Sequence, residues 1–127
     1  MPRKKTKNPV DLLSEVIAEA LLDKKAKDPV ILDFRKLGSS LCDSFFICHG
    51  TSRTQVEALA DGVIREVKKK TGLTPYHREG FENAEWILID YADIIVHIFQ
   101  ASKRDFYNLE QLWADAEIMK IDPKQKN

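Results

Sequence analysis

The chain has few cysteines and no long apolar run. Its 127 residues include only two cysteines, Cys42 and Cys48, which lie six residues apart in a segment predicted to be one loop and one strand. A disulfide would have to fold this extended stretch back on itself, so we interpret both as free thiols in a reducing compartment. No apolar run approaches the roughly 20 residues that a membrane span needs.

The N-terminal region is also not expected to be a targeting signal. The basic segment 1–7 has no apolar stretch behind it, which is unlike a secretory signal, and it has too little Arg and Ser for a transit peptide. We therefore expect a cytoplasmic, bacterial protein. We expect residues 1–8 to form a flexible basic tail, 9–118 a single domain, and 119–127 a second flexible tail.

The chain has no net charge, because 20 basic residues balance 20 acidic ones, but the charges are unevenly distributed. Between Met1 and Arg78 there are 15 basic and 10 acidic residues, whereas between Glu79 and Glu117 there are 2 basic and 9 acidic residues. An acidic second half repels phosphate backbones and attracts basic proteins, among which ribosomal proteins are an obvious class.

Hydrophobic periodicity and capping signals predict the secondary structure. A helix is expected to begin at Asn8-Pro9 and end before Pro29, and a second to begin at Ser52 and end near Gly72. The remaining expected elements are strands at 30–34, 43–48 and 75–78, a hairpin at 85–100, and short helices capped by Ser102 and by Asn108. This order predicts one α/β domain (α+β-like) with a mixed five-stranded sheet flanked by helices.

The hairpin is the most informative segment. With Tyr91 and Ala92 at the centre of its turn, strand alternation sorts the side chains onto two faces. One face is uniformly β-branched and suits packing under helices; it carries Ile87, Ile89, Ile94, Val96 and Ile98. The other is aromatic, polar and acidic, as protein-binding surfaces often are; it carries Trp86, Leu88, Asp90, Ile95, His97 and Phe99. Alternatively, a C-terminal helix with Trp113 covers the second face, either fully or so as to leave Trp86 and Asp90 exposed.

The motifs that could support catalysis or nucleic-acid binding are weak. Gly50-Thr51-Ser52 opens a helix and could hold a phosphate, but no strand after it offers paired carboxylates for magnesium. The three histidines and Cys48 lack metal-ligand spacing, so we expect no metal and no cofactor. The basic clusters lack aromatic stacking partners and predict at most weak contacts with ribosomal RNA; they are Arg3, Lys4, Lys5 and Lys7, and Lys68, Lys69 and Lys70.

A series of motif blocks between Val10 and Ala116 resembles the Iojap family of ribosomal silencing factors. The blocks occur in the family's order and together are specific. They are Asp33 with Arg35, Asp43-x-Phe45-x-Ile47-Cys48-x-Gly50-x-Ser52, Gln55-Val56-x-Ala58, His77-x-Glu79-Gly80, Trp86-Ile87-Leu88-Ile89-Asp90-Tyr91-x-Asp93, Val96-His97-x-Phe99, and Phe106-Tyr107-x-Leu109-Glu110-x-Leu112-Trp113-x-Asp115-Ala116. Two positions depart from the pattern: His49 replaces a small hydroxylated residue, and Ala92 stands where the family usually has Gly.

The resemblance implies a function that is steric rather than enzymatic. Family members bind ribosomal protein L-fourteen on the large ribosomal subunit, block association with the small subunit, and lower translation when nutrients are scarce. The implied fold is a nucleotidyltransferase-like core that lacks the catalytic carboxylates. Two alternatives remain: a degenerate nucleotidyltransferase-like enzyme that binds nucleotide and magnesium, and a self-associating protein whose apolar face forms a homodimer.

We expect the partner-binding residues to lie on the hairpin. Trp86 is the expected apolar anchor, and Asp90 and Asp93 are expected to pair with Lys or Arg on the partner. Leu88, Tyr91 and His97 complete this predicted site.

Overall fold

The computed structural model describes residues 8–38 and 42–122. Its elements, in chain order, are α1 (Pro9–Asp23), β1 (Lys27–Asp33), the 3-10 helix η1 (Arg35–Leu37), β2 (Ser44–Gly50), α2 (Arg53–Thr71), β3 (His77–Glu79), β4 (Trp86–Asp90), β5 (Ile94–Gln100), α3 (Ala101–Tyr107), α4 (Leu109–Leu112) and β6 (Glu117–Lys120). The predicted N-terminal tail, apart from Asn8, and the last five residues of the predicted C-terminal tail lie outside the described residues.

Local capping signals set the ends of the two long helices. The Asn8 side chain accepts a hydrogen bond from the Asp11 N–H at 2.9 Å, and the Ser52 hydroxyl accepts one from the Gln55 N–H at 3.1 Å. Gly72 ends α2 in the left-handed conformation. These predictions are confirmed. No helix among the described residues is long and apolar enough to cross a membrane.

The sheet is mixed, as predicted, but it has six strands rather than five. The strand order is β3-β4-β5-β2-β1-β6, and β2 and β5 form its parallel pair. The additional strand, β6, pairs antiparallel with β1 and places Ile118 opposite Leu32. It crosses the predicted domain boundary at residue 118, so residues 119 and 120 belong to the sheet rather than to a tail.

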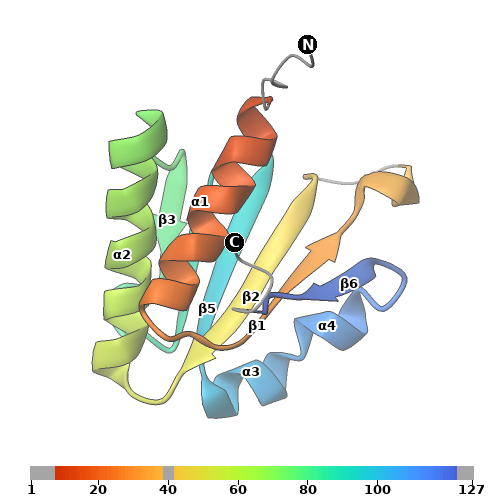
Figure 1. Ribbon diagram of the computed structural model, residues 1–127. Helices are drawn as coiled ribbons and strands as arrows, with labels where there is room; N and C mark the ends of the chain where they lie inside the picture. The colour runs from red at the N-terminus through yellow and green to blue at the C-terminus, as the bar shows by residue number, and fades with distance from the viewer. Residues whose placement is uncertain (1–7, 39–41, 123–127) are drawn as a thin grey trace.

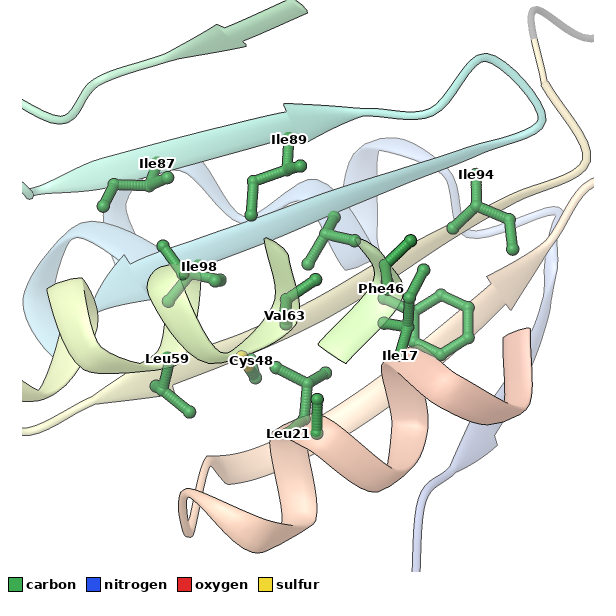
Figure 2. Packing of buried hydrophobic residues seen from close by; sticks show 14 of the residues in the cluster. Ile17, Leu21, Phe46, Cys48, Leu59, Val63, Ile87, Ile89, Ile94 and Ile98 are labelled. Carbon is green, nitrogen blue, oxygen red and sulfur yellow. The ribbon is translucent and has the colours of Figure 1, made fainter. Parts of the chain in front are cut away.

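Helices cover the sheet unequally. The long helices α1 and α2 lie side by side against one face (Figure 1). Figure 2 shows side chains from both helices meeting the sheet residues beneath them. The labelled ones are Ile17, Leu21, Leu59 and Val63 from the helices, Phe46 and Cys48 from β2, and Ile87, Ile89, Ile94 and Ile98 from β4 and β5. The predicted β-branched layer is therefore the buried core. The short helices α3 and α4 cover only part of the opposite face.

One short-helix cap differs from the prediction. The N-cap of α3 is Gln100, which makes no side-chain capping bond, so Ser102 is not a cap. Asn108 does cap α4, because its side-chain oxygen accepts from the Gln111 N–H at 3.4 Å.

The hairpin between β4 and β5 is offset from the predicted register. Trp86 pairs with Phe99 rather than His97, and the Tyr91 N–H donates to the Ile94 carbonyl at 2.9 Å. The two turn residues are therefore Ala92 and Asp93. Because each residue moves by two positions along its partner strand, every side chain stays on its predicted face.

Backbone strain at Ala92 explains this turn. Its φ is +75°, and the Asp93 N–H donates to the Tyr91 carbonyl at 2.9 Å, which is the pattern of a γ-turn with a positive-φ central residue. The Asp90 carboxylate accepts the Ala92 N–H at 2.7 Å and helps to hold it. A positive φ is costly for alanine, whereas glycine adopts it freely.

We therefore expect Ala92→Gly to raise the free energy of unfolding by about 1 kcal/mol. Glycine removes the strain, although its greater freedom in the unfolded chain offsets part of the gain. Urea denaturation measures the change. The control is Ala58→Gly on the exposed side of α2, which should lower the free energy of unfolding by about 1 kcal/mol. A lower free energy of unfolding in both variants would contradict the strain at Ala92.

Candidate functional site

Three of the six predicted site residues project together from β4. Trp86, Leu88 and Asp90 alternate with the buried Ile87 and Ile89, and each of the three is partly exposed. They lie on the sheet face opposite α1 and α2, because Ile87 and Ile89 contact those helices. Asp93 is exposed in the adjoining turn.

The structure places the other two predicted residues differently. Tyr91 is 4% exposed and packs in the core beneath α1 and α2, so it does not reach the surface that carries Trp86. Its hydroxyl has no hydrogen-bond partner within the described part of the chain. His97 lies on the expected face but is also only 4% exposed. Neither side chain can offer a partner much surface in this conformation.

The α3–α4 segment covers only part of this sheet face, as in one of the alternatives considered. Trp113 packs against Phe34 and Phe45, with ring centroids 5.2 and 6.2 Å apart, and so lies over the β1–β2 side. At the other side Tyr107 packs against the Trp86 ring at an interplanar angle of 45°, with centroids 4.6 Å apart. An uncovered region remains above β4.

We call this uncovered region the docking face. Its apolar part consists of Trp86, Leu88, Ile95 and Tyr107. The carboxylates of Glu79 and Asp90 lie on the same sheet face, and Asp93 is exposed in the adjoining turn. Glu79 comes from β3, where it lies opposite Leu88 and pairs with His77. Sequence reasoning missed Tyr107 and Glu79 as site residues, although both stand in the family blocks. The face presents aromatic and aliphatic surface beside carboxylates.

In the loop that could have held a phosphate, the polar groups of Thr51 already have a hydrogen-bond partner in Gln55. The Thr51 N–H and hydroxyl both donate to the Gln55 side-chain oxygen, at 2.7 and 3.1 Å. The Gln55 amide in turn donates to the Lys25 carbonyl at 3.1 Å. A phosphate at this helix start would have to displace Gln55, which weakens the nucleotide-binding alternative.

The cysteines and histidines form no reactive or metal-binding group in the part of the chain that is described. Cys42 and Cys48 are buried free thiols, as predicted, and burial raises their pKa values to about 11 and about 12. The described residues contain no group of three or more His, Cys, Asp and Glu side chains that could hold a metal ion. His49 instead accepts a hydrogen bond from Arg104 at 2.9 Å.

The predicted RNA-contacting lysines are only partly described. Arg3, Lys4, Lys5 and Lys7 lie outside the described residues. At the end of α2, Lys70 pairs with Glu19 and Glu66, each at 3.7 Å, while Lys68 donates to the Gly72 carbonyl at 3.4 Å. These basic groups suit the negative end of α2.

Comparison with known proteins gives a consistent result. Residues 6–127 match the family model described as "Ribosomal silencing factor during starvation". The chain is 40% identical over 111 residues to Ribosomal silencing factor RsfS of Bacillus subtilis, covering 85% of this chain and 90% of that protein. It is 44% identical over 102 residues to the protein of that name from Haemophilus influenzae, covering 80% and 98%.

Solved structures agree with the sequence matches. A crystal structure of a Chromobacterium violaceum protein superposes with a TM-score of 0.78 at 37% identity, covering 84% of this chain and 88% of that one. A Bacillus halodurans structure gives a TM-score of 0.71 at 42% identity, covering 81% and 94%. The family model and these relatives each span most of the chain, and it belongs to the family of ribosomal silencing factors that act during starvation.

Proposed function

We propose that the protein binds the large ribosomal subunit through ribosomal protein L-fourteen and sterically blocks association with the small subunit. Membership of the silencing-factor family supports a role on the ribosome during starvation. The observation that carries the finer proposal is the docking face, where partly exposed apolar side chains lie beside the carboxylates of Glu79 and Asp90. Such a surface complements a basic protein with an apolar recess.

The proposed mechanism requires only occupancy. A protein held beside the intersubunit face prevents the small subunit from approaching, so no reaction and no cofactor are needed. Weak contacts between Lys68 or Lys69 and ribosomal RNA would add affinity without sequence specificity. Self-association through the docking face would compete with ribosome binding, because both would bury Trp86 and Leu88.

We expect Trp86→Ala to weaken binding to purified bacterial large subunits by at least about 30-fold, and Asp93→Ala by about 5-fold or less. Truncating Trp86 removes a large apolar anchor, whereas Asp93 is a solvent-exposed charge. Co-sedimentation with large subunits measures both. The matched control is Leu12→Ala, which truncates an exposed apolar residue on α1, behind the docking face, and should bind normally.

A larger effect for Asp93→Ala than for Trp86→Ala would contradict the proposed anchor. The steric mechanism has a separate test on sucrose gradients. Added wild-type protein should shift whole ribosomes toward free subunits, and Trp86→Ala should not. Binding without this shift would refute the block of subunit association while leaving the docking face intact.

A further inference from the structure

The Trp86 indole is already hydrogen-bonded inside the molecule. Its Nε1–H donates to Nδ1 of His97 at 3.1 Å. An indole N–H can only donate, so Nδ1 must accept, which requires a neutral His97 with its proton on Nε2. The bond runs diagonally across the β4–β5 pair, because Trp86 lies directly opposite Phe99 and His97 is two residues before it.

His97 is itself firmly held. It is 4% exposed, and its ring packs edge-on against Phe45 with centroids 4.4 Å apart. Its Nε2 is buried without a partner in the described part of the chain. Within the described part of the chain, the His97 ring is therefore hydrogen-bonded through Nδ1 to Trp86 and not through Nε2. A polar residue in this position carries a desolvation cost that an apolar residue would avoid.

Two aromatic rings complete the support of the indole. Trp86 stacks on Phe99 with a 5.0 Å centroid separation and a 29° interplanar angle. Tyr107 of α3 packs against it at an interplanar angle of 45°, with centroids 4.6 Å apart. Stacking restricts the plane of the indole but does not distinguish the two orientations related by a flip about the Cβ–Cγ bond. A directional hydrogen bond from Nε1 to a fixed acceptor selects one of these orientations.

Resting on the docking function proposed above, we propose that His97 is a positioning residue that fixes the Trp86 indole for docking, and that the partner therefore contacts Trp86 through apolar groups without supplying a hydrogen-bond acceptor. Interface tryptophans commonly offer their N–H to the partner, but here it is already used. Ordering the side chain before binding avoids an entropy cost worth about 3- to 10-fold in affinity.

Two substitutions at His97 separate positioning from packing. His97→Asn keeps an acceptor oxygen close to the place of Nδ1, whereas His97→Leu fills similar volume and offers none. We expect His97→Leu to weaken binding to purified large subunits by about 3- to 10-fold and His97→Asn to restore most of it. Equal losses in both variants, or normal binding by His97→Leu, would overturn the proposal.

A spectroscopic measurement reports the contact directly. The ¹H–¹⁵N resonance of the Trp86 indole N–H should exchange slowly with water in the wild type and in His97→Asn, and faster in His97→Leu. The Trp113 indole in the same spectrum is the internal control, because its ring contacts are with Phe34 and Phe45. Unchanged exchange in His97→Leu would show that His97 does not hold the indole.

A further variant tests whether the partner contacts Trp86 through apolar groups. Trp86→Phe removes the N–H but keeps a ring, and should weaken binding by about 5-fold or less, far from the loss in Trp86→Ala. In the Trp86→Phe background, His97→Leu should have no further effect. A Trp86→Phe loss as large as that of Trp86→Ala would overturn the apolar contact.

These outcomes distinguish the inference from the function on which it rests. Normal binding by Trp86→Ala would overturn the docking face and the positioning role together. A loss in Trp86→Ala with equal behaviour of the two His97 variants would overturn the positioning role alone.

Discussion

Arg104→Ala is expected to lower the free energy of unfolding by about 2 to 4 kcal/mol, because a buried guanidinium that serves several partly buried acceptors is lost. Arg104 is 8% exposed, although it lies on the short helix α3. Its guanidinium forms an ion pair with Glu110 at 2.6 Å and also donates to His49 Nδ1 at 2.9 Å. One side chain therefore connects α3, the start of α4 and β2.

The same guanidinium also donates hydrogen bonds to carbonyls in an irregular part of β1. It donates to the Lys27 and Asp28 carbonyls at 3.3 and 2.8 Å, where the register of β1 against β2 shifts and Asp28 has a φ of +46°. Alanine would leave the Glu110 carboxylate and these carbonyls without their donor. These partly buried acceptors, left unpaired, account for most of the expected loss.

Urea denaturation of Arg104→Ala tests this role. Lys103→Ala is the matched control, because it removes the neighbouring cation, whose ion pair with Glu85 at 3.9 Å is more exposed, and should cost less than about 1 kcal/mol. Arg104→Lys should recover little, since an ammonium group cannot reproduce the guanidinium's several directed donors. Similar losses in Arg104→Ala and Lys103→Ala would refute the structural role.

Features that depend on neighbours in sequence could be predicted. The predicted apolar stripe of α1 is buried as expected, because helical periodicity and the Asn8-Pro9 start are local signals. The two faces of β4 and β5 were also predicted correctly, since side chains alternate strictly along a strand. Trp86, Leu88 and Asp90 were assigned to one surface on this basis alone.

Features that depend on distant segments could not be predicted. All four residues of β6 are exposed, and the strand exists because its backbone pairs with β1 more than 80 residues earlier in the sequence. The hairpin register depends on Ala92 adopting a positive φ, which sequence patterns disfavour for alanine. In both places tertiary contacts outweigh the local preference.

The same distinction applies to the site. The burial of His97 depends on Phe45 from β2, and that of Tyr91 on the helices of the opposite face. Alternation places a side chain on a face but does not say what covers that face. Arg104 gave no sequence signal at all, since an arginine in a short polar helix is normally solvated.

The second large effect is an acid-dependent loss of stability that originates at His97. Burial alone lowers the pKa of His97 from 6.5 to about 4 in the folded protein. Above pH 6.5 the folded and unfolded chains are both neutral at this residue, so it makes no pH-dependent contribution. Between pH 6.5 and 4 the unfolded chain binds a proton that the folded chain does not, which favours unfolding.

We expect this single group to remove roughly 3 kcal/mol of stability once the pH has fallen below about 4. Denaturation of the wild type and of His97→Asn from pH 7.5 to 4 measures it. Asp33, whose pKa is lowered by hydrogen bonds from Arg35, and His49, whose pKa is lowered by burial and by Arg104, add acid sensitivity to both proteins. Only the difference between the two curves belongs to His97.

The difference in the free energy of unfolding between the wild type and His97→Asn should narrow as the pH falls through 6.5. At pH 7.5 His97→Asn should be the less stable protein, because the amide fits an aromatic environment less well than a neutral imidazole, and at pH 4 its disadvantage should shrink or reverse. A constant difference across the range would mean that His97 titrates normally and is not held neutral. Because an imidazolium could not accept the Trp86 N–H, the same proton would also release the indole, so slow exchange of the Trp86 N–H should be lost as His97 becomes protonated.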